Sequence, residues 1–208
     1  MARNDVGHDV QRGTGRRPTW QSAAAVTLGF VAVLWLIEVV DSVANHKLDE
    51  FGVEPRSTHG LLGILFAPLL HGGWGHLEAN TVPTLVLGFL VLVTGIVRGL
   101  EATAIIWVVG GVGVWLVAPS GSIHLGASVL IFGWLVYLMI RGFFTRRFLQ
   151  IALGIVLFVA YGSLLLGALP GEPGISWQGH LFGALGGALA ARLVSFDDVK
   201  VRSRRQLV

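Results

Sequence analysis

The stretch HGGWGHLEANTVPTLVLGFLVLVTGIV, residues 71–97, joins polar side chains directly to a long apolar run. His76 and Asn80 stand at the start of this run, which extends over about 77–97. A helix needs about 20 apolar residues to cross the ~30 Å hydrocarbon core of a bilayer, so the run predicts a transmembrane helix. Ionisable side chains at membrane depth are costly and rarely occur without a role. The stretch therefore predicts a membrane protein with a chemical site at one end of a span.

The composition of the whole chain fits the same class. Of the 208 residues, 53% are hydrophobic and 13% are charged, whereas charged residues make up about 25% of soluble domains. The chain has no cysteine, which excludes disulfides, a thiolate nucleophile and a cysteine-based metal site. The basic residues flank apolar segments and do not form a patch with interleaved aromatic residues, so we expect no nucleic-acid partner.

Apolar runs divide the chain into spans, and we expect an all-α integral membrane protein with six transmembrane helices. A polar tail precedes the bundle at 1–21, the membrane domain covers 22–195, and a basic tail follows at 196–208. The predicted spans lie at about 22–43, 77–97, 102–117, 127–140, 148–166 and 180–194.

Two features lie between the first two spans. The apolar piece LLGILFAPLL at 61–70 is too short to cross the hydrocarbon core, which predicts an interfacial or re-entrant loop. Glu38 and Asp41 stand at the far end of the first span, where we expect their carboxylates to reach the lipid headgroups.

Basic residues predict the orientation of the bundle. Of the fifteen Lys and Arg residues, a six-span chain places Lys47 and Arg56 on one side and the other thirteen on the side of both tails. Cytoplasmic loops are enriched in Lys and Arg, so we expect both termini in the cytoplasm, with a bacterial cell membrane as the location. His76, Ser128 and His180 then lie near the outer ends of three different spans. The thirteen residues are Arg3, Arg12, Arg16, Arg17, Arg98, Arg141, Arg146, Arg147, Arg192, Lys200, Arg202, Arg204 and Arg205.

Ser128 begins a short apolar stretch that ends at Arg141. A helix of about 14 residues rises only ~21 Å, so it would begin below the outer surface and leave the loop at 118–126 at membrane depth. The free N–H groups at the start of this helix could stabilise an oxyanion beside Ser128. The alternative is that Ser128 is an ordinary helix N-cap.

His180 opens the last span, and Gly183 and Gly187 follow three and seven residues later. These positions share one helical face. Because small residues let transmembrane helices approach closely, the glycine face predicts a helix contact, and His180 is expected to point into the bundle. A serine on one helix and a histidine on another are what a membrane-embedded hydrolase requires.

His76 and Asn80 are four residues apart and share a helical face. Both side chains can donate a hydrogen bond to a developing oxyanion. The alternative is that they satisfy the backbone of the 61–75 loop. His46, His59, His71 and His124 lie in the outer loops and carry less weight, and the HExxH pattern of zinc proteases is absent, so we expect no metal and no cofactor.

Together these motifs resemble those of the rhomboid intramembrane serine proteases in their minimal six-span bacterial form. The matching pieces are HGGWGHLEAN with its His-x-x-x-Asn, the Gly-x-Ser of LGASVLIFG and the His-x-x-Gly-x-x-x-Gly of GHLFGALGG. The loop VEPRSTHGLLGILFAPLLHG before the second span also fits. The resemblance extends from about Trp35 to Arg192.

The resemblance implies a serine-type endopeptidase that needs no cofactor and cleaves transmembrane protein substrates. Ser128 would be the nucleophile and His180 the general base, acting as a dyad without a carboxylate. His76, Asn80 and the backbone N–H of Ser128 would form the oxyanion hole. Phe132 would stack on the catalytic histidine.

The glycines Gly126, Gly183 and Gly187 would allow close packing near this site. The chain departs from the family at Val129, because the family usually has Gly directly after the nucleophile, and a β-branched residue stiffens that turn.

Two other functions are compatible with a polar site in a membrane bundle. A catalytically impaired rhomboid-like protein that binds transmembrane helices would typically lack the serine or the histidine, and this chain has both. A small transporter would favour internal repeats or paired broken helices, and the sequence has neither.

Overall fold

The computed structural model describes residues 19–171 and 174–205, with side chains described as far as Ser195. The predicted polar tail therefore lies almost wholly outside the described residues, as do the side chains of the basic C-terminal tail. In the described part the fold is helical, and its one β-bridge pairs Val53 with His124. The elements are α1 (Thr19–Val43), η1 (Leu48–Phe51), α2 (Thr58–Phe66), η2 (Ala67–Leu69), α3 (Trp74–Val93), α4 (Ile96–Val117), α5 (Ser128–Thr145), α6 (Phe148–Tyr161), η3 (Gly162–Ala168) and α7 (Trp177–Arg205).

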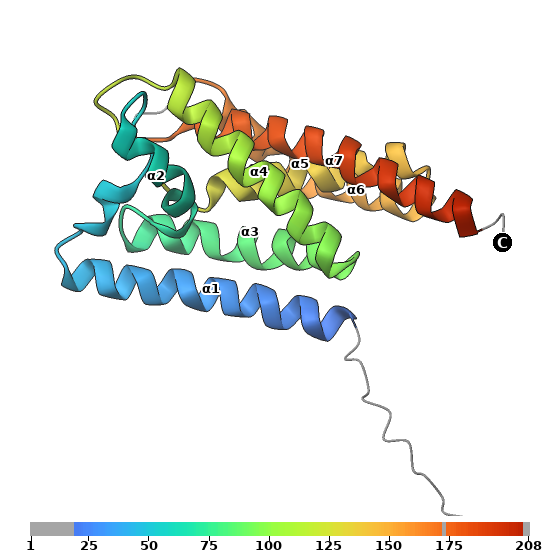
Figure 1. Ribbon diagram of the computed structural model, residues 1–208. Helices are drawn as coiled ribbons and strands as arrows, with labels where there is room; N and C mark the ends of the chain where they lie inside the picture. The colour runs from blue at the N-terminus through green and yellow to red at the C-terminus, as the bar shows by residue number, and fades with distance from the viewer. Residues whose placement is uncertain (1–18, 172–173, 206–208) are drawn as a thin grey trace, which may run out of the picture.

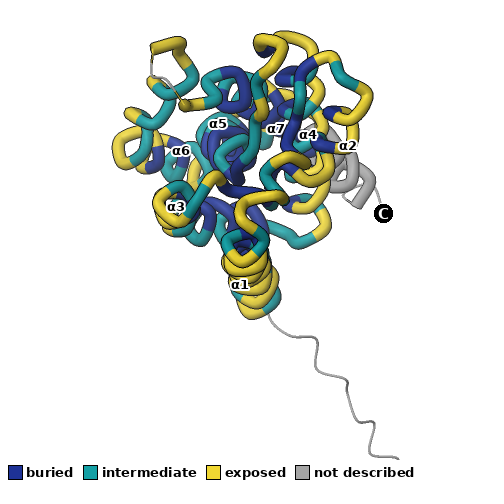
Figure 2. The backbone as a smooth tube through the Cα atoms, turned by 90° about the vertical axis from the view of Figure 1, so that its left-hand side faces the viewer, coloured by how far each residue is buried: buried dark blue, intermediate teal, exposed yellow. Residues whose placement is uncertain are grey.

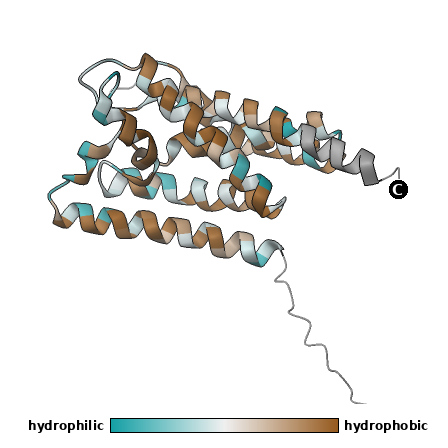
Figure 3. Cartoon of the chain, viewed as in Figure 1, coloured by the Kyte–Doolittle hydropathy of each residue, from teal (hydrophilic) through white to brown (hydrophobic). Residues whose placement is uncertain are grey.

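The helices carry the apolar surface of a multi-pass membrane protein. Within residues 19–171 and 174–205, five segments are long and apolar enough to cross a membrane: α1, α3, α4, α5 and the continuous stretch of α6 and η3. Their outward faces present large apolar side chains, such as Leu36 of α1 and Val159 of α6, and brown dominates the bundle in Figure 3. Soluble proteins rarely expose apolar patches of this extent. The prediction of an all-α membrane bundle is confirmed, whereas a sixth crossing by α7 stays a prediction.

Helix α5 forms the centre of the bundle. It packs against α7, α6, α3 and α4, while α7 also packs along α4. Leu130, Leu135 and Leu138 of α5 are fully buried in this core. Helix α1 contacts mainly α3 and lies at the periphery, with much of its surface exposed (Figure 2). Helix α6 is likewise exposed over most of its length.

Glycines allow α5 and α7 to approach backbone to backbone. A Cβ atom on Gly183 would overlap the carbonyl oxygen of Val129, and one on Gly187 would overlap the carbonyl oxygen of Gly133. A Cβ on Gly133 would in turn lie 2.8 Å from the carbonyl oxygen of Gly183. Backbone atoms cannot move aside as side chains can, so these positions require glycine.

The two ends of the bundle differ in their loops. The start of α1 and the end of α7 lie at one end, whereas η1, α2 and the loops that follow α4 and η3 gather at the other (Figure 1). Ser128 begins α5, and His180 lies in the first turn of α7, at the end with the larger loops.

The structure corrects the predicted end of the fourth span. Helix α5 runs on to Thr145, and Arg141, where the predicted apolar stretch ends, is 2% exposed. Its Nη1 donates a hydrogen bond of 2.6 Å to Thr94 Oγ1, and its guanidinium lies 5.0 Å from the centre of the Tyr137 ring. These internal partners make burial of the charge tolerable.

Glu38 and Asp41 are also placed differently from the expectation. Each is 1% exposed, so both carboxylates are turned into the protein and not toward lipid headgroups.

The glycine contact gives a stability prediction. We expect Gly187→Ala to lower the melting temperature in detergent by several degrees, because overpacking against a fixed backbone typically costs about 1–3 kcal/mol. Gly29→Ala in α1 is the matched control, since a Cβ there meets nothing within 4 Å and Ala is the better helix former. Equal melting temperatures for the two variants would contradict the close α5–α7 contact.

Candidate active site at one end of the bundle

Ser128 is the first residue of α5 and follows a sharp turn. Ala127 is the N-cap, no side chain caps the helix, and Gly126 has a φ of +119° that L side chains rarely adopt. Ser128 is therefore not the N-cap that we considered as an alternative, and no described residue hydrogen-bonds to its Oγ. As at any helix start, the first N–H groups have no carbonyl of their own helix to bond.

His180 lies in the first turn of α7 and has two fixed contacts. Its ring stacks on Phe132, which lies one turn after Ser128, with ring centroids 3.9 Å apart and an interplanar angle of 8°. Its Nδ1 lies 2.9 Å from the carbonyl oxygen of Gly167 in η3. A carbonyl can only accept, so Nδ1 carries the proton and Nε2 of the neutral ring keeps its lone pair. This is the tautomer that a general base at Nε2 needs.

Ser128 Oγ and His180 are not hydrogen-bonded to each other among the described contacts. Phe132, on the same helix as Ser128, connects them through its stack on His180. Hydrogen bonds between catalytic pairs are often long before substrate binds, so the absence of this bond is compatible with catalysis.

His76 lies beside the turn that precedes Ser128. A Cβ on Gly126 would lie 2.8 Å from His76 Nε2 and 3.6 Å from Ser128 Oγ, so this edge of the ring faces the turn. His76 Nδ1 accepts a long hydrogen bond of 3.4 Å from the Gly72 N–H. Nε2 then carries the proton in the neutral ring and can donate. His76 therefore does bond to the backbone of the 61–75 loop, through Nδ1. Its Nε2–H is still able to donate a hydrogen bond.

Asn80 is one turn further along α3 and is 5% exposed. Its Nδ2 donates a hydrogen bond of 2.9 Å to the carbonyl oxygen of His76. This bond lies within α3 and does not reach the 61–75 loop. An amide nitrogen has two hydrogens, so a second donor remains on Asn80.

His71 supports the same turn, although we assigned it little weight from the sequence. It is 1% exposed, its ring lies edge-on to that of His76 at 5.1 Å, and its Nε2 accepts a long hydrogen bond of 3.4 Å from the Ala127 N–H. Burial, and then the neighbouring His76, lower the pKa of His71 to about 4. The sequence did contain a signal for this role, because His71 stands five residues before His76 in the stretch 71–97.

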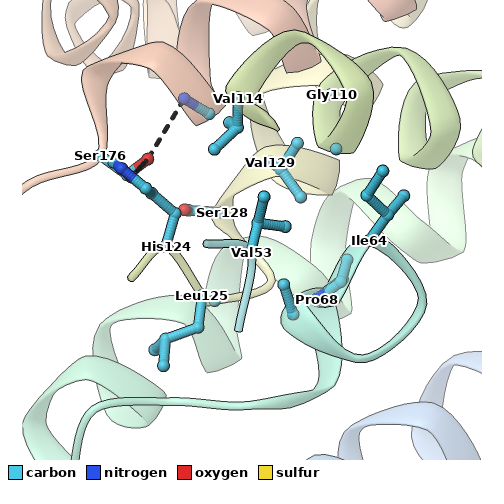
Figure 4. Close-up of a pocket in the computed structure, with 14 residues that line it drawn as sticks. Val53, Ile64, Pro68, Gly110, Val114, His124, Leu125, Ser128, Val129 and Ser176 are labelled. Carbon is cyan, nitrogen blue, oxygen red and sulfur yellow. Dashed lines mark hydrogen bonds between the residues drawn. The ribbon is translucent and has the colours of Figure 1, made fainter. Parts of the chain in front are cut away.

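An open pocket lies beside Ser128 (Figure 4). Its volume of about 30 Å³ is enough for at least one water molecule. Most of the wall is apolar, with Val53, Ile64 and Val114 lining it, and Ser176 contributes a hydroxyl.

His124 ties two loops together at the edge of this pocket. Its Nε2 lies 2.8 Å from Ser122 Oγ and its Nδ1 lies 2.7 Å from Ser176 Oγ. The hydroxyl of Ser122 donates to the Pro119 carbonyl at 2.6 Å. A hydroxyl has one proton, so His124 donates to Ser122 and accepts from Ser176. Burial lowers the pKa of His124, which favours this neutral arrangement.

Val129 turns its side chain toward α4. A Cβ on Gly110 would overlap Val129 Cγ2. The missing side chain at Gly110 therefore provides the space that the Val129 side chain occupies. The branched residue after Ser128 is thereby accommodated by the neighbouring helix.

The histidines of the outer loops do not gather into one site. His71 and His76 are neighbours, but His124 and His180 have separate partners, and His46 and His59 lie elsewhere. Among the described residues, the group with three possible metal ligands close together is Asp41, His46 and Asp49.

One family model matches most of this chain, and two relatives of the chain are uncharacterized proteins. The model of the Rhomboid domain matches residues 58–196. An uncharacterized protein of Mycobacterium tuberculosis (strain ATCC 25618 / H37Rv) is 47% identical over 201 residues, which cover 93% of this chain and 84% of that protein. An uncharacterized protein of Mycobacterium leprae (strain TN) is 42% identical over 214 residues, which cover 99% and 85%. No solved structure gives a significant match.

The buried His71 predicts a loss of stability in acid. Above pH 6.5 the ring is neutral in both the folded and the unfolded chain. Between pH 6.5 and about 4, only the unfolded chain takes up the proton, so the free energy of unfolding falls, by about 2 kcal/mol at pH 5. The amide of His71→Gln can still accept from Ala127 but does not titrate, so its melting temperature should fall less than that of the wild type between pH 7.5 and pH 5.

His59→Gln, at an exposed histidine, is the control and should keep the wild-type pH dependence. Parallel melting curves for the wild type and His71→Gln would show that His71 does not titrate in this way.

Proposed function

The chain belongs to the rhomboid family, and on that premise we propose that it is an intramembrane serine endopeptidase with Ser128 and His180 as its catalytic dyad. The observation that carries the proposal is the pair of contacts at His180. The Gly167 carbonyl fixes the proton on Nδ1 while Phe132 holds the ring plane, which leaves Nε2 available as a base. Ser128, whose Oγ has no hydrogen bond to any described residue, begins the helix that carries Phe132.

In the first half of the reaction, His180 Nε2 takes the Ser128 Oγ proton as Oγ attacks the carbonyl carbon of the scissile bond. The carbonyl oxygen becomes an oxyanion, to which the Ser128 N–H, His76 Nε2 and Asn80 Nδ2 donate. The C–N bond then breaks, and His180 returns the proton to the leaving amine. The acyl group stays on Ser128 as an ester.

In the second half, water attacks this ester. His180 takes a proton from the water, the tetrahedral intermediate collapses, and the proton returns to Ser128 Oγ as the carboxylic acid leaves. The pocket beside Ser128 has room for a water molecule, which supports a hydrolytic reaction.

The dyad works without a carboxylate. A neutral carbonyl stabilises a transient imidazolium less than an aspartate would, but it selects the same tautomer. Close packing on Phe132 limits rotation of the ring, so orientation depends on two uncharged contacts. This arrangement avoids burying a permanent negative charge in the bundle.

We further propose six spans within a membrane domain at 22–195, with both termini in the cytoplasm of a bacterial cell. The distribution of basic residues supports this orientation. The substrates are then transmembrane proteins that reach the site from the bilayer. The apolar wall of the pocket beside Ser128 suits side chains from such segments.

The dyad gives the first activity prediction. Ser128→Ala and His180→Ala should each abolish cleavage of a fluorogenic transmembrane peptide by purified protein in detergent. The double variant should be no worse than either single one, because residues that act as one catalytic unit are strongly non-additive. Ser163→Ala, at an exposed serine in η3, is the matched control and should keep wild-type turnover.

A fluorophosphonate probe tests the same assignment without a substrate, because it labels only an activated serine. We expect labelling of the wild type and none of Ser128→Ala. A folded wild-type protein that neither cleaves nor reacts would favour the alternative of an impaired rhomboid-like protein that binds transmembrane helices.

Asn80 gives the second activity prediction. Loss of one oxyanion donor typically costs about 10²–10³ in turnover, and we expect Asn80→Ala at the low end because two donors remain. Thr81→Val is the control in the same turn: Thr81 Oγ1 donates to the Leu77 carbonyl at 2.8 Å and accepts from Trp35 Nε1 at 3.1 Å, so this variant loses a bond to the preceding turn of α3 and one to α1. Similar losses of stability in both variants, with turnover per folded molecule unchanged in Asn80→Ala, would refute a role for Asn80 in the oxyanion hole.

A further inference from the structure

The chain folds back on itself where α1 ends. Asn45 and His46 both have left-handed φ values, 56° and 59°, and the His46 N–H donates to the Asp41 carbonyl at 2.9 Å. The next element, η1, begins beside the same residue, because the Leu48 N–H donates to Asp41 Oδ1 at 2.7 Å. This turn brings Asp41, His46 and Asp49 together, with one ligand atom from each within 4.8 Å of the others.

The separations are close to those of a coordinated ion. His46 Nδ1 lies 3.4 Å from Asp41 Oδ2 and 4.0 Å from Asp49 Oδ2. Metal–ligand bonds of about 2.0–2.2 Å place neighbouring ligand atoms about 3–3.5 Å apart in tetrahedral or octahedral sites. A small movement of the Asp49 side chain would bring all three ligand atoms to coordination distance from one ion.

Two carboxylate oxygens of this turn have no hydrogen-bond donor among the described residues, although Asp41 Oδ1 accepts from Leu48. Asp41 is 1% exposed and its Oδ2 is buried with no hydrogen bond, as is Oδ1 of Asp49. Buried anions of this kind are costly unless a cation or donor satisfies them.

Glu38 points to a ligand independently of these three residues. It lies one turn before Asp41 on α1, it is 1% exposed, and its Oε1 is buried without a hydrogen-bond partner. Its charge interacts with those of Asp41, His46 and Asp49. A bound cation would explain a further unsatisfied carboxylate whose charge interacts with those of the three ligand residues.

We propose that Asp41, His46 and Asp49 bind one divalent ion of the zinc class, with Glu38 as a supporting carboxylate. An imidazole nitrogen combined with carboxylate oxygens suits Zn²⁺, whereas Ca²⁺ and Mg²⁺ prefer oxygen ligands alone. The His46 side chain is 49% exposed, which gives the ion access from solvent and leaves room for water to complete the coordination.

The site would fix the loop that leads to the candidate active site. Beyond η1 the chain passes through Gly52 to Val53, whose N–H donates to the His124 carbonyl at 2.8 Å. Val53 also lines the pocket beside Ser128. The ion would therefore hold the end of α1 against the segment that bounds this pocket. None of its ligands belongs to the proposed catalytic set, so the inference stands whether or not the chain is a protease.

Zinc binding to the full-length protein tests the proposal directly. The protein should be purified in detergent with a tag free of histidine, stripped with EDTA and titrated with Zn²⁺ against a fluorescent chelator. We expect one ion per chain and a higher melting temperature with Zn²⁺. His46→Gln and Asp49→Asn should each weaken binding at least tenfold.

The controls are Glu50→Gln and His59→Gln, which change exposed neighbours of the same chemical types and should bind as the wild type does. Melting temperatures without Zn²⁺ establish that each variant is folded. Absence of saturable binding to the wild type, or binding that both His46→Gln and Asp49→Asn retain in full, would overturn the site. Displacement of Zn²⁺ by a hundredfold excess of Ca²⁺ or Mg²⁺ would overturn the choice of ion.

Discussion

The contact between α5 and α7 is the constraint on which the rest of the structure depends. The two backbones meet at Gly133, Gly183 and Gly187, where any side chain would collide with a carbonyl group. In lipid, where burial of apolar side chains gains little, such close packing is a main source of helix association. Ser128 and His180 begin these same two helices, so the glycine contact also sets how the start of one lies relative to the start of the other.

The turn before Ser128 is held by polar groups that satisfy one another inside an apolar bundle. Gly126 supplies the backbone conformation and leaves room for the His76 ring, while His71 accepts the N–H of Ala127. On the other side of the turn, Val53 pairs with His124. Irregular backbone inside a membrane protein needs partners for its polar groups, and these contacts supply them.

Much of this architecture could be predicted from the sequence, because run length and small-residue spacing are local signals. The apolar runs located the helices, and the motifs at His76, Ser128 and His180 located the end of the bundle that carries polar chemistry. The sequence could not indicate which charges are internal. Arg141 is buried because Thr94, far away in the chain, accepts its hydrogen bond. Glu38 and Asp41 face inward because the chain reverses after α1, which hydropathy does not reveal.

The hydrogen bond from His180 to Gly167 has a consequence for the surroundings of the protein. Gly167 belongs to η3, the continuation of α6, and α6 presents most of its surface outward. A displacement of α6 would therefore move the Gly167 carbonyl that accepts the proton of His180 Nδ1. Because one hydrogen bond separates the outward-facing α6–η3 segment from this imidazole, a detergent micelle and a native membrane are different surroundings for His180.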